Sequence, residues 1–135
     1  MNRTIKFRSW NIEENIMHDL AFPSWNGSHE VWEDNKPQSK VQYLSNNGPE
    51  EQGILMQYTG LKDKNGVEIY EGDIVEGSYF EPNPLTEIKY TGSIVFEDAS
   101  FICKSEGLID RYIGDRLFKG LEVIGNVHQN KELLQ

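Results

Sequence analysis

The chain has 135 residues, of which 37% are hydrophobic and 11% aromatic, and this length and composition are typical of one globular domain. Its 22 acidic residues outnumber its 13 basic residues, so the formal net charge is -9 and the summed field repels phosphate backbones. The composition therefore excludes a wholly disordered chain, and the charge disfavours binding to nucleic acid.

The single cysteine, Cys103, excludes an intramolecular disulfide framework and a zinc site built from several cysteines. It lies in the run SFICK, and we expect it to be buried in a strand. No apolar run reaches the roughly 20 residues of a membrane span, and the N-terminal residues lack the apolar block of a secretion signal. We therefore expect a cytoplasmic protein that has no membrane partner.

The N-terminal third combines a short strand with a long aromatic segment. In residues 4–10, Ile5 and Phe7 alternate with basic residues, which predicts a strand with one buried face. Residues 11–53 mix aromatic side chains with prolines, glycines and short polar residues, and we expect an irregular extension. The one regular element that its pattern suggests is a brief helix over residues 13–20.

A strand, a tight turn and a returning strand are predicted from residue 54 onward. Residues 54–59 are expected to form a buried strand, and Asn65 with Gly66 accepts the positive φ of a tight hairpin turn. The chain then returns through residues 67–70. Gly72 predicts a bend or bulge that carries the chain from one sheet into another.

The following segment predicts two hairpins. Strands over residues 75–80 and 88–96 flank an exposed loop, residues 81–85, because its two prolines cannot sustain a central ladder. Residues 97–99 join the second strand to a third one near residues 101–103, and a carboxylate in this turn can bond to the following amides.

The last segment predicts a helix, a strand and a final turn. Apolar residues recur at helical spacing between residues 105 and 120, although a glycine interrupts them. Residues 121–127 return to strand character, and Asn130 can cap a turn over residues 131–134.

Together these elements predict a mainly β fold with minor short helices, in the form of a small curled sheet or an SH3-like barrel. We expect a single domain over residues 1–135, in which residues 1–53 form the N-terminal strand and the variable aromatic extension. The barrel-like core and a short C-terminal helix then occupy residues 54–135.

Four motifs carry a family resemblance: LMQYTGLKDKNG, EIYEGDIV, GSIVFED and LEVIGNVHQN. In this order and length they resemble the YopX family of phage and prophage proteins over residues 55–134, with a fainter match at residues 5–10. The resemblance implies a predominantly β protein of bacterial viruses or integrated prophages. It implies no established activity, cofactor or catalytic residue.

An acidic cluster is one candidate site. Glu71 and Asp73 stand two apart, so on an extended chain their carboxylates share a face. With Glu97 or Asp98 from a neighbouring strand, they could hold a divalent cation or act as acid and base. Against this, Gly72 favours a bulge in which the carboxylate accepts backbone hydrogen bonds, and cation sites draw on more ligands. We favour this second interpretation, in which the carboxylate accepts backbone hydrogen bonds and has a structural role.

Other chemistry finds little support in the sequence. The three histidines stand in no ligand motif, no G-x-S-x-G elbow occurs, and Cys103 is expected in the core. We therefore predict no catalytic residue, no metal ligand and no cofactor.

Four aromatic residues are candidate partner contacts: Trp25, Trp32, Tyr58 and Tyr70. Tryptophan is enriched in binding hot spots, but these two tryptophans can equally cover one end of the barrel. Tyrosines on strands stack bases in oligonucleotide-binding barrels, yet they are also ordinary strand residues.

These observations favour a non-catalytic module that binds a host or phage protein. Two alternatives remain open at this point: a metal-dependent enzyme or accessory factor that uses the acidic cluster, and a nucleic-acid-binding barrel. Homo-oligomers could form through strand edges near the N-terminus.

Overall fold

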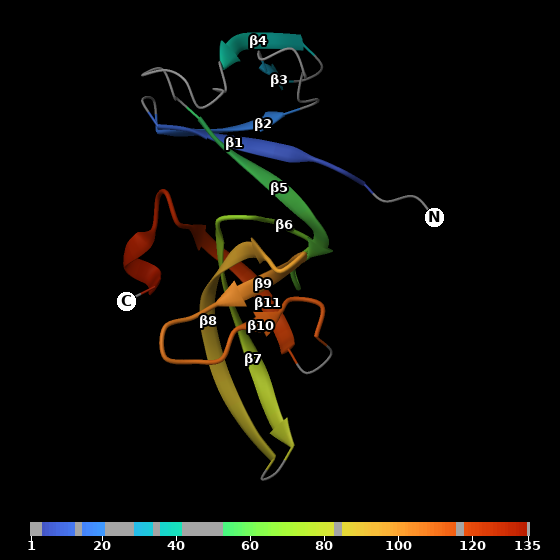
Figure 1. Cartoon of the computed structure of the whole chain (residues 1–135), viewed down its shortest axis with the longest axis vertical. Helices are drawn as coiled ribbons and strands as arrows, with labels where there is room; N and C mark the ends of the chain where they lie inside the picture. Colours follow the sequence, from blue (N-terminus) through green and yellow to red (C-terminus); the bar gives the residue numbers. More distant parts are fainter. Residues whose placement is uncertain are drawn as a thin grey trace. The chain divides into compact units, whose positions relative to one another are not determined.

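The computed structural model describes residues 4–12, 15–20, 29–33, 36–41, 53–82, 85–115 and 118–134. Its elements in chain order are β1 (Phe7–Asn11), β2 (Ile16–Leu20), β3 (His29–Glu33), β4 (Lys36–Val41), β5 (Gly53–Lys62), β6 (Glu68–Tyr70), β7 (Asp73–Pro82), β8 (Leu85–Glu97), β9 (Ser100–Lys104), β10 (Arg111–Tyr112), β11 (Phe118–Asn126) and the 3-10 helix η1 (Lys131–Leu134) (Figure 1).

The chain divides into two compact units, residues 1–58 and residues 59–135. The boundary lies inside β5, close to the expected division between the extension and the core. The expectation that both parts form a single domain stays a prediction.

Each unit is antiparallel β structure, which confirms the expected mainly β class and its curled sheet. Among the described residues, no helix has the length and apolar character needed to cross a membrane.

In the first unit, β1 pairs with β2 on one side and with β5 on the other. The expected N-terminal strand is confirmed, but it begins at Phe7, and Ile5 lies outside it and is exposed. The central position of β1 instead buries Ser9 and Trp10, which stand on opposite faces. The alternation of apolar and basic residues therefore predicted the wrong set of buried side chains: Ile5 is exposed, whereas Ser9 and Trp10 are buried.

The extension contains more strand than its sequence suggested. The brief helix expected over residues 13–20 is wrong, because Ile16–Leu20 is a strand whose backbone pairs with β1. Strands β3 and β4 form a hairpin in the segment expected to be irregular. Pairing with a neighbouring strand overrides weak helical periodicity, since it satisfies the same backbone groups.

The second unit contains a five-stranded sheet in the order β10-β9-β8-β7-β11. Strands β7 and β8 form its long central hairpin, which runs from Ile74 opposite Ser93 to Pro82 opposite Leu85 (Figure 1). The expected loop over residues 81–85 is thus too long, because Pro82 and Leu85 both belong to strands. Two register shifts between β11 and β7 bend the edge of the sheet and help it curl.

One buried cluster stabilises this curled sheet. It consists of Ile69, Val75, Tyr90, Ile94, Cys103, Ile113 and Phe118. The rings of Tyr90 and Phe118 meet edge to face, with centroids 5.2 Å apart, a favourable aromatic geometry. Cys103 is fully buried in β9, so its predicted place in a core strand is confirmed.

Gly72 carries the chain from β6 into β7, and these two strands belong to different sheets. Its φ of 80° is readily accessible only to glycine. Its amide donates to the carbonyl of Ile94 and its own carbonyl accepts from the amide of Val127, both at 2.8 Å. The predicted bend between sheets is therefore confirmed.

The turn before β6 differs in detail from its prediction. Gly66 has a φ of 82°, but Asn65 is not in the left-handed region. The carbonyl of Asp63 accepts from the amide of Gly66 at 3.0 Å, and the amide of Asp63 donates to the carbonyl of Val67 at 2.8 Å. A four-residue turn with Asp63 at its first position and the left-handed Gly66 at its last explains this pattern.

The hairpin between β8 and β9 is confirmed, with Glu97 opposite Ser100. Its two turn residues, Asp98 and Ala99, have φ values of 50° and 61°, which are typical of the tightest hairpins. The expected bonds from a carboxylate to the following amides are not what forms this turn. Left-handed backbone at both positions matches the twist of the strands instead.

The helix expected over residues 105–120 is wrong. Residues 105–110 form a loop, and Arg111 and Tyr112 then pair with Cys103 and Ile102 of β9. Gly107 adopts a φ of 81°, which breaks any helix. The apolar residues at helical spacing therefore do not share one buried face.

The predicted C-terminal strand and final turn are confirmed as β11 and η1. Asn130 does not cap that turn with its side chain. Its Oδ1 accepts from the amide of Asn126 at 3.2 Å, and its backbone carbonyl accepts from the amide of Leu133 at 3.0 Å.

Candidate functional site

The four residues of the predicted acidic cluster have separate environments. Asp73 is buried, and its carboxylate accepts from the amide of Tyr70 at 2.8 Å. Glu97 forms an ion pair with Lys104 at 2.7 Å, whereas Asp98 lies exposed in the adjacent turn. Glu71 is half-buried. Among the described residues, no three His, Cys, Asp or Glu side chains come together in a way that could hold a metal ion.

Two of the four predicted aromatic contacts, Tyr58 and Tyr70, are buried. Trp25 lies outside the described residues, and Trp32 belongs to β3, but the placement of its side chain is not described. Tyr58 and Tyr70 are only 7% and 8% exposed, so little of either ring is accessible to a partner. The Lys6 ammonium lies 5.7 Å from the centroid of the Tyr58 ring.

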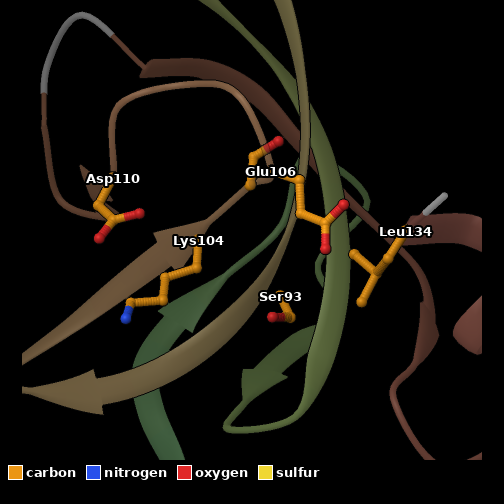
Figure 2. Close-up of a pocket in the computed structure, with 6 residues that line it drawn as sticks. Ser93, Lys104, Glu106, Asp110 and Leu134 are labelled. Carbon is orange, nitrogen blue, oxygen red and sulfur yellow. The ribbon is translucent and has the colours of Figure 1, made fainter.

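A different surface of the second unit has features of a recognition site. The loop of residues 105–110 separates two hollows. The first, here called the polar hollow, has a volume of about 290 Å³ and is lined by Ser93, Lys104, Ser105, Glu106, Asp110 and Leu134. Figure 2 shows that Glu106 and Asp110 approach it from the loop, Ser93 from β8 and Leu134 from η1.

The second hollow, here called the apolar hollow, has a volume of about 130 Å³. Its lining includes Tyr79, Glu81, Ile88, Leu108, Ile109 and Arg111. The guanidinium carbon of Arg111 lies 3.4 Å from the centroid of the Tyr79 ring, in a cation–π stack. This stack holds the arginine flat against its own unit.

The lysine of the polar hollow does not provide a reactive group. The hydrogen bond from Lys104 to Glu97 raises the pKa of its ammonium, and the nearby charges of Asp110 and Asp98 act in the same direction. Lys104 is therefore protonated at neutral pH and is neither a base nor a nucleophile there. Among the described residues that line the polar hollow, none is a histidine that could activate its serine hydroxyls. The groups present can bind polar atoms by hydrogen bonds and charge.

The loop between the hollows is anchored by a core residue. Tyr90 is only 2% exposed, and its hydroxyl donates to the carbonyls of Cys103 at 2.8 Å and Ile109 at 3.0 Å. Burial, together with the nearby Cys103 and Asp110, raises the pKa of Tyr90 to about 12. The hydroxyl therefore remains a donor over the physiological range. The hydrogen bond to Ile109 therefore attaches the backbone of the loop to the core.

This anchored loop exposes large apolar side chains. Leu108 and Ile109 are 41% and 71% exposed, both line the apolar hollow, and we call them the exposed ridge. The helical spacing of the apolar residues between 105 and 120 predicted a short helix, and this expectation gave no sign of the exposed ridge. Gly107 and Gly114, which bracket the ridge, were the available signal for a loop.

The fold and this surface define a small, mainly β protein with a curled antiparallel sheet and an exposed apolar ridge. A model of the YopX protein family matches residues 6–135, so the chain belongs to the YopX family. This result confirms the resemblance carried by the four sequence motifs.

Two solved structures are similar over almost the whole chain. One is protein EF1440 from Enterococcus faecalis, with 30% sequence identity, a TM-score of 0.66, and coverage of 99% of this chain and 100% of that one. The other is protein yopX from Bacillus subtilis, with 23% identity, a TM-score of 0.57 and the same coverage, which indicates a shared fold. No curated protein matches the chain.

Proposed function

We propose that this chain is a non-catalytic protein-binding module, encoded by a phage or prophage, that acts in the cytoplasm of a bacterial host on a host or phage protein. The observation that carries the proposal is the exposed ridge, because a buried tyrosine hydroxyl fixes the backbone of its most exposed residue. A rigid apolar surface loses little conformational entropy when a partner covers it. The bacterial sources of the two structural relatives agree with such a host.

The residue types around the ridge support this proposal. Tyrosine and arginine are enriched at binding hot spots, and Tyr79 and Arg111 line the apolar hollow together with the exposed Leu108 and Ile109. The polar hollow, by contrast, combines a protonated lysine with serine hydroxyls and two exposed carboxylates, Glu106 and Asp110. Recognition suits this set of groups better than bond cleavage.

Affinity purification from a prophage-bearing host, followed by calorimetry with the purified candidate, tests the proposal. The full chain carries the affinity tag, and a tagged protein of similar size and charge serves as the control bait. We expect one protein to be retained in stoichiometric amount by this chain alone and to bind it with saturable heat. If no protein passes both steps, or if the control bait retains the same protein equally, the proposal is wrong.

A further inference from the structure

The exposed ridge is bordered by carboxylates on both sides of the loop. Glu106 and Asp110 line the polar hollow, and Glu81 lines the apolar hollow. All three are exposed, and no basic side chain in the described part of the chain forms an ion pair with them. The rim of this surface is therefore acidic.

The two cations in the same hollows compensate that negative charge only in part. Lys104 is bound to Glu97 at 2.7 Å, and Arg111 is stacked on the ring of Tyr79. The direction of the Lys104 pKa shift agrees with a local excess of carboxylates, since Asp110 contributes to it. The net charge of -9 adds a field of the same sign over a longer range.

An apolar centre with a polar rim is the usual arrangement of a protein interface, and here that rim carries carboxylates. From this arrangement we propose that the exposed ridge and its acidic rim bind a basic segment of a partner protein, in which lysine or arginine flanks a large apolar side chain. The apolar side chain packs against Ile109 at the apolar hollow, and a basic side chain enters the polar hollow between Glu106 and Asp110. The inference rests on the proposed function and names its surface and its partner chemistry.

Charge complementarity decides between this occupant and two others. An acidic segment would meet the carboxylates of the rim, and a second copy would bring the same acidic rim against itself. Like charges opposed across an interface are unfavourable and slow the encounter. Both remain as outcomes that the experiment must reveal.

Defined peptides provide the test. Three fluorescein-labelled peptides of equal length, about 15 residues each, combine lysine with leucine, glutamate with leucine, and lysine with serine. Anisotropy titrations with the full chain at low salt are expected to give at least about ten-fold tighter binding for the lysine–leucine peptide than for either other peptide, with weaker binding as salt increases. Amide shifts of the isotope-labelled protein are expected to concentrate in residues 105–112.

Substitutions on the exposed surface locate the site without threatening the fold. Ile109→Ser and the double variant Glu106→Gln with Asp110→Asn are each expected to weaken binding of the lysine–leucine peptide at least about five-fold, and the double variant also reduces its salt dependence. Val67→Ser, at a residue 48% exposed before β6, and Glu87→Gln on β8 are the matched controls and are expected to leave binding unchanged.

Several results would overturn this inference. They are equal binding of the glutamate–leucine peptide, amide shifts outside residues 105–112, no effect of Ile109→Ser, or a dimer in sedimentation that Ile109→Ser dissociates. If the tagged full chain retains a partner that Ile109→Ser retains equally, the surface is wrong and the proposed function stands. If no variant and no wild-type chain retains any partner, the proposed function itself fails.

Discussion

The carboxylate of Asp63 accepts a hydrogen bond from the backbone amide of Val123 at 2.9 Å, which joins the turn after β5 to the edge strand β11 across 60 positions of sequence. The other carboxylate oxygen accepts from the amides of Asn65 at 2.8 Å and Val67 at 2.9 Å. One side chain therefore both shapes the turn and attaches it to the curled sheet.

Removal of the Asp63 carboxylate is expected to destabilise the protein. Asp63→Ala leaves three backbone amides without this acceptor, and we expect a loss of about 3 kcal/mol in the free energy of unfolding, measured with urea. Asp63→Asn keeps one carbonyl oxygen for the turn, so its loss is expected to be about half as large. Equal losses in the two variants would show that the bonds to Asn65 and Val67 contribute nothing, and no loss in Asp63→Asn would show the same of the bond to Val123.

Stability at low pH is expected to depend on the same carboxyl group. Burial raises its pKa, but the hydrogen bonds from the amides of Val123, Val67 and Asn65, together with the charge of Lys64, outweigh that effect and bring the pKa below 3.8. A group with a lowered pKa in the folded state stabilises above its unfolded pKa and loses that contribution as the pH falls. The free energy of unfolding should therefore decrease below about pH 5, and Asp63→Asn should show a shallower decrease over the same range. Parallel curves for the two proteins would contradict this.

Tyr90→Phe is expected to lower stability by about 1–2 kcal/mol, because the carbonyls of Cys103 and Ile109 lose their shared donor. Hydrogen exchange in residues 105–110 should become faster in this variant. The pKa of Tyr90 is raised to about 12, so its contribution is present below pH 10 and is lost as the pH rises through 12. Tyr112→Phe, at an exposed ring, is the control and should change neither quantity.

Ala99→Gly is expected to stabilise the protein by about 0.5–1 kcal/mol. Ala99 holds a φ of 61°, which strains an L-residue with a Cβ atom, and glycine relieves that strain in the β8–β9 turn. Gly66→Ala is the converse variant: no atom lies within 4 Å of the added Cβ, but the φ of 82° should make it destabilising by about 1 kcal/mol. Urea unfolding of both variants measures the effects, and changes of the same sign would refute the argument.

Gly92→Ala is expected to lower the free energy of unfolding by about 2–3 kcal/mol. The added Cβ would clash with the carbonyl oxygen of Lys104 and would lie only 2.8 Å from the Cys103 sulfur. Gly107→Ala separates backbone strain from steric clash as the cause of destabilisation. Its added Cβ meets no atom within 4 Å, and only its φ of 81° is unfavourable. We expect a loss of about 1 kcal/mol there. A smaller loss for Gly92→Ala than for Gly107→Ala would show that β8 and β9 separate easily.

The amino-acid sequence by itself was enough to predict several local features of this protein. The bend at Gly72, the hairpin at Asp98 and Ala99, and the burial of Cys103 follow from conformational and apolar preferences that a few neighbouring residues express. The four family motifs lie in the same well-patterned part of the chain.

Tertiary structure alone decided where the apolar residues of 105–112 lie and what Asp63 binds. Ile109 is exposed because Tyr112 and Arg111 pair with β9 and because Tyr90, from another strand, fixes the Ile109 carbonyl. Helical spacing cannot reveal these long-range bonds, since a strand pairing satisfies the backbone as well as a helix does. The candidate site was therefore set by contacts between segments distant in sequence, which no local pattern records.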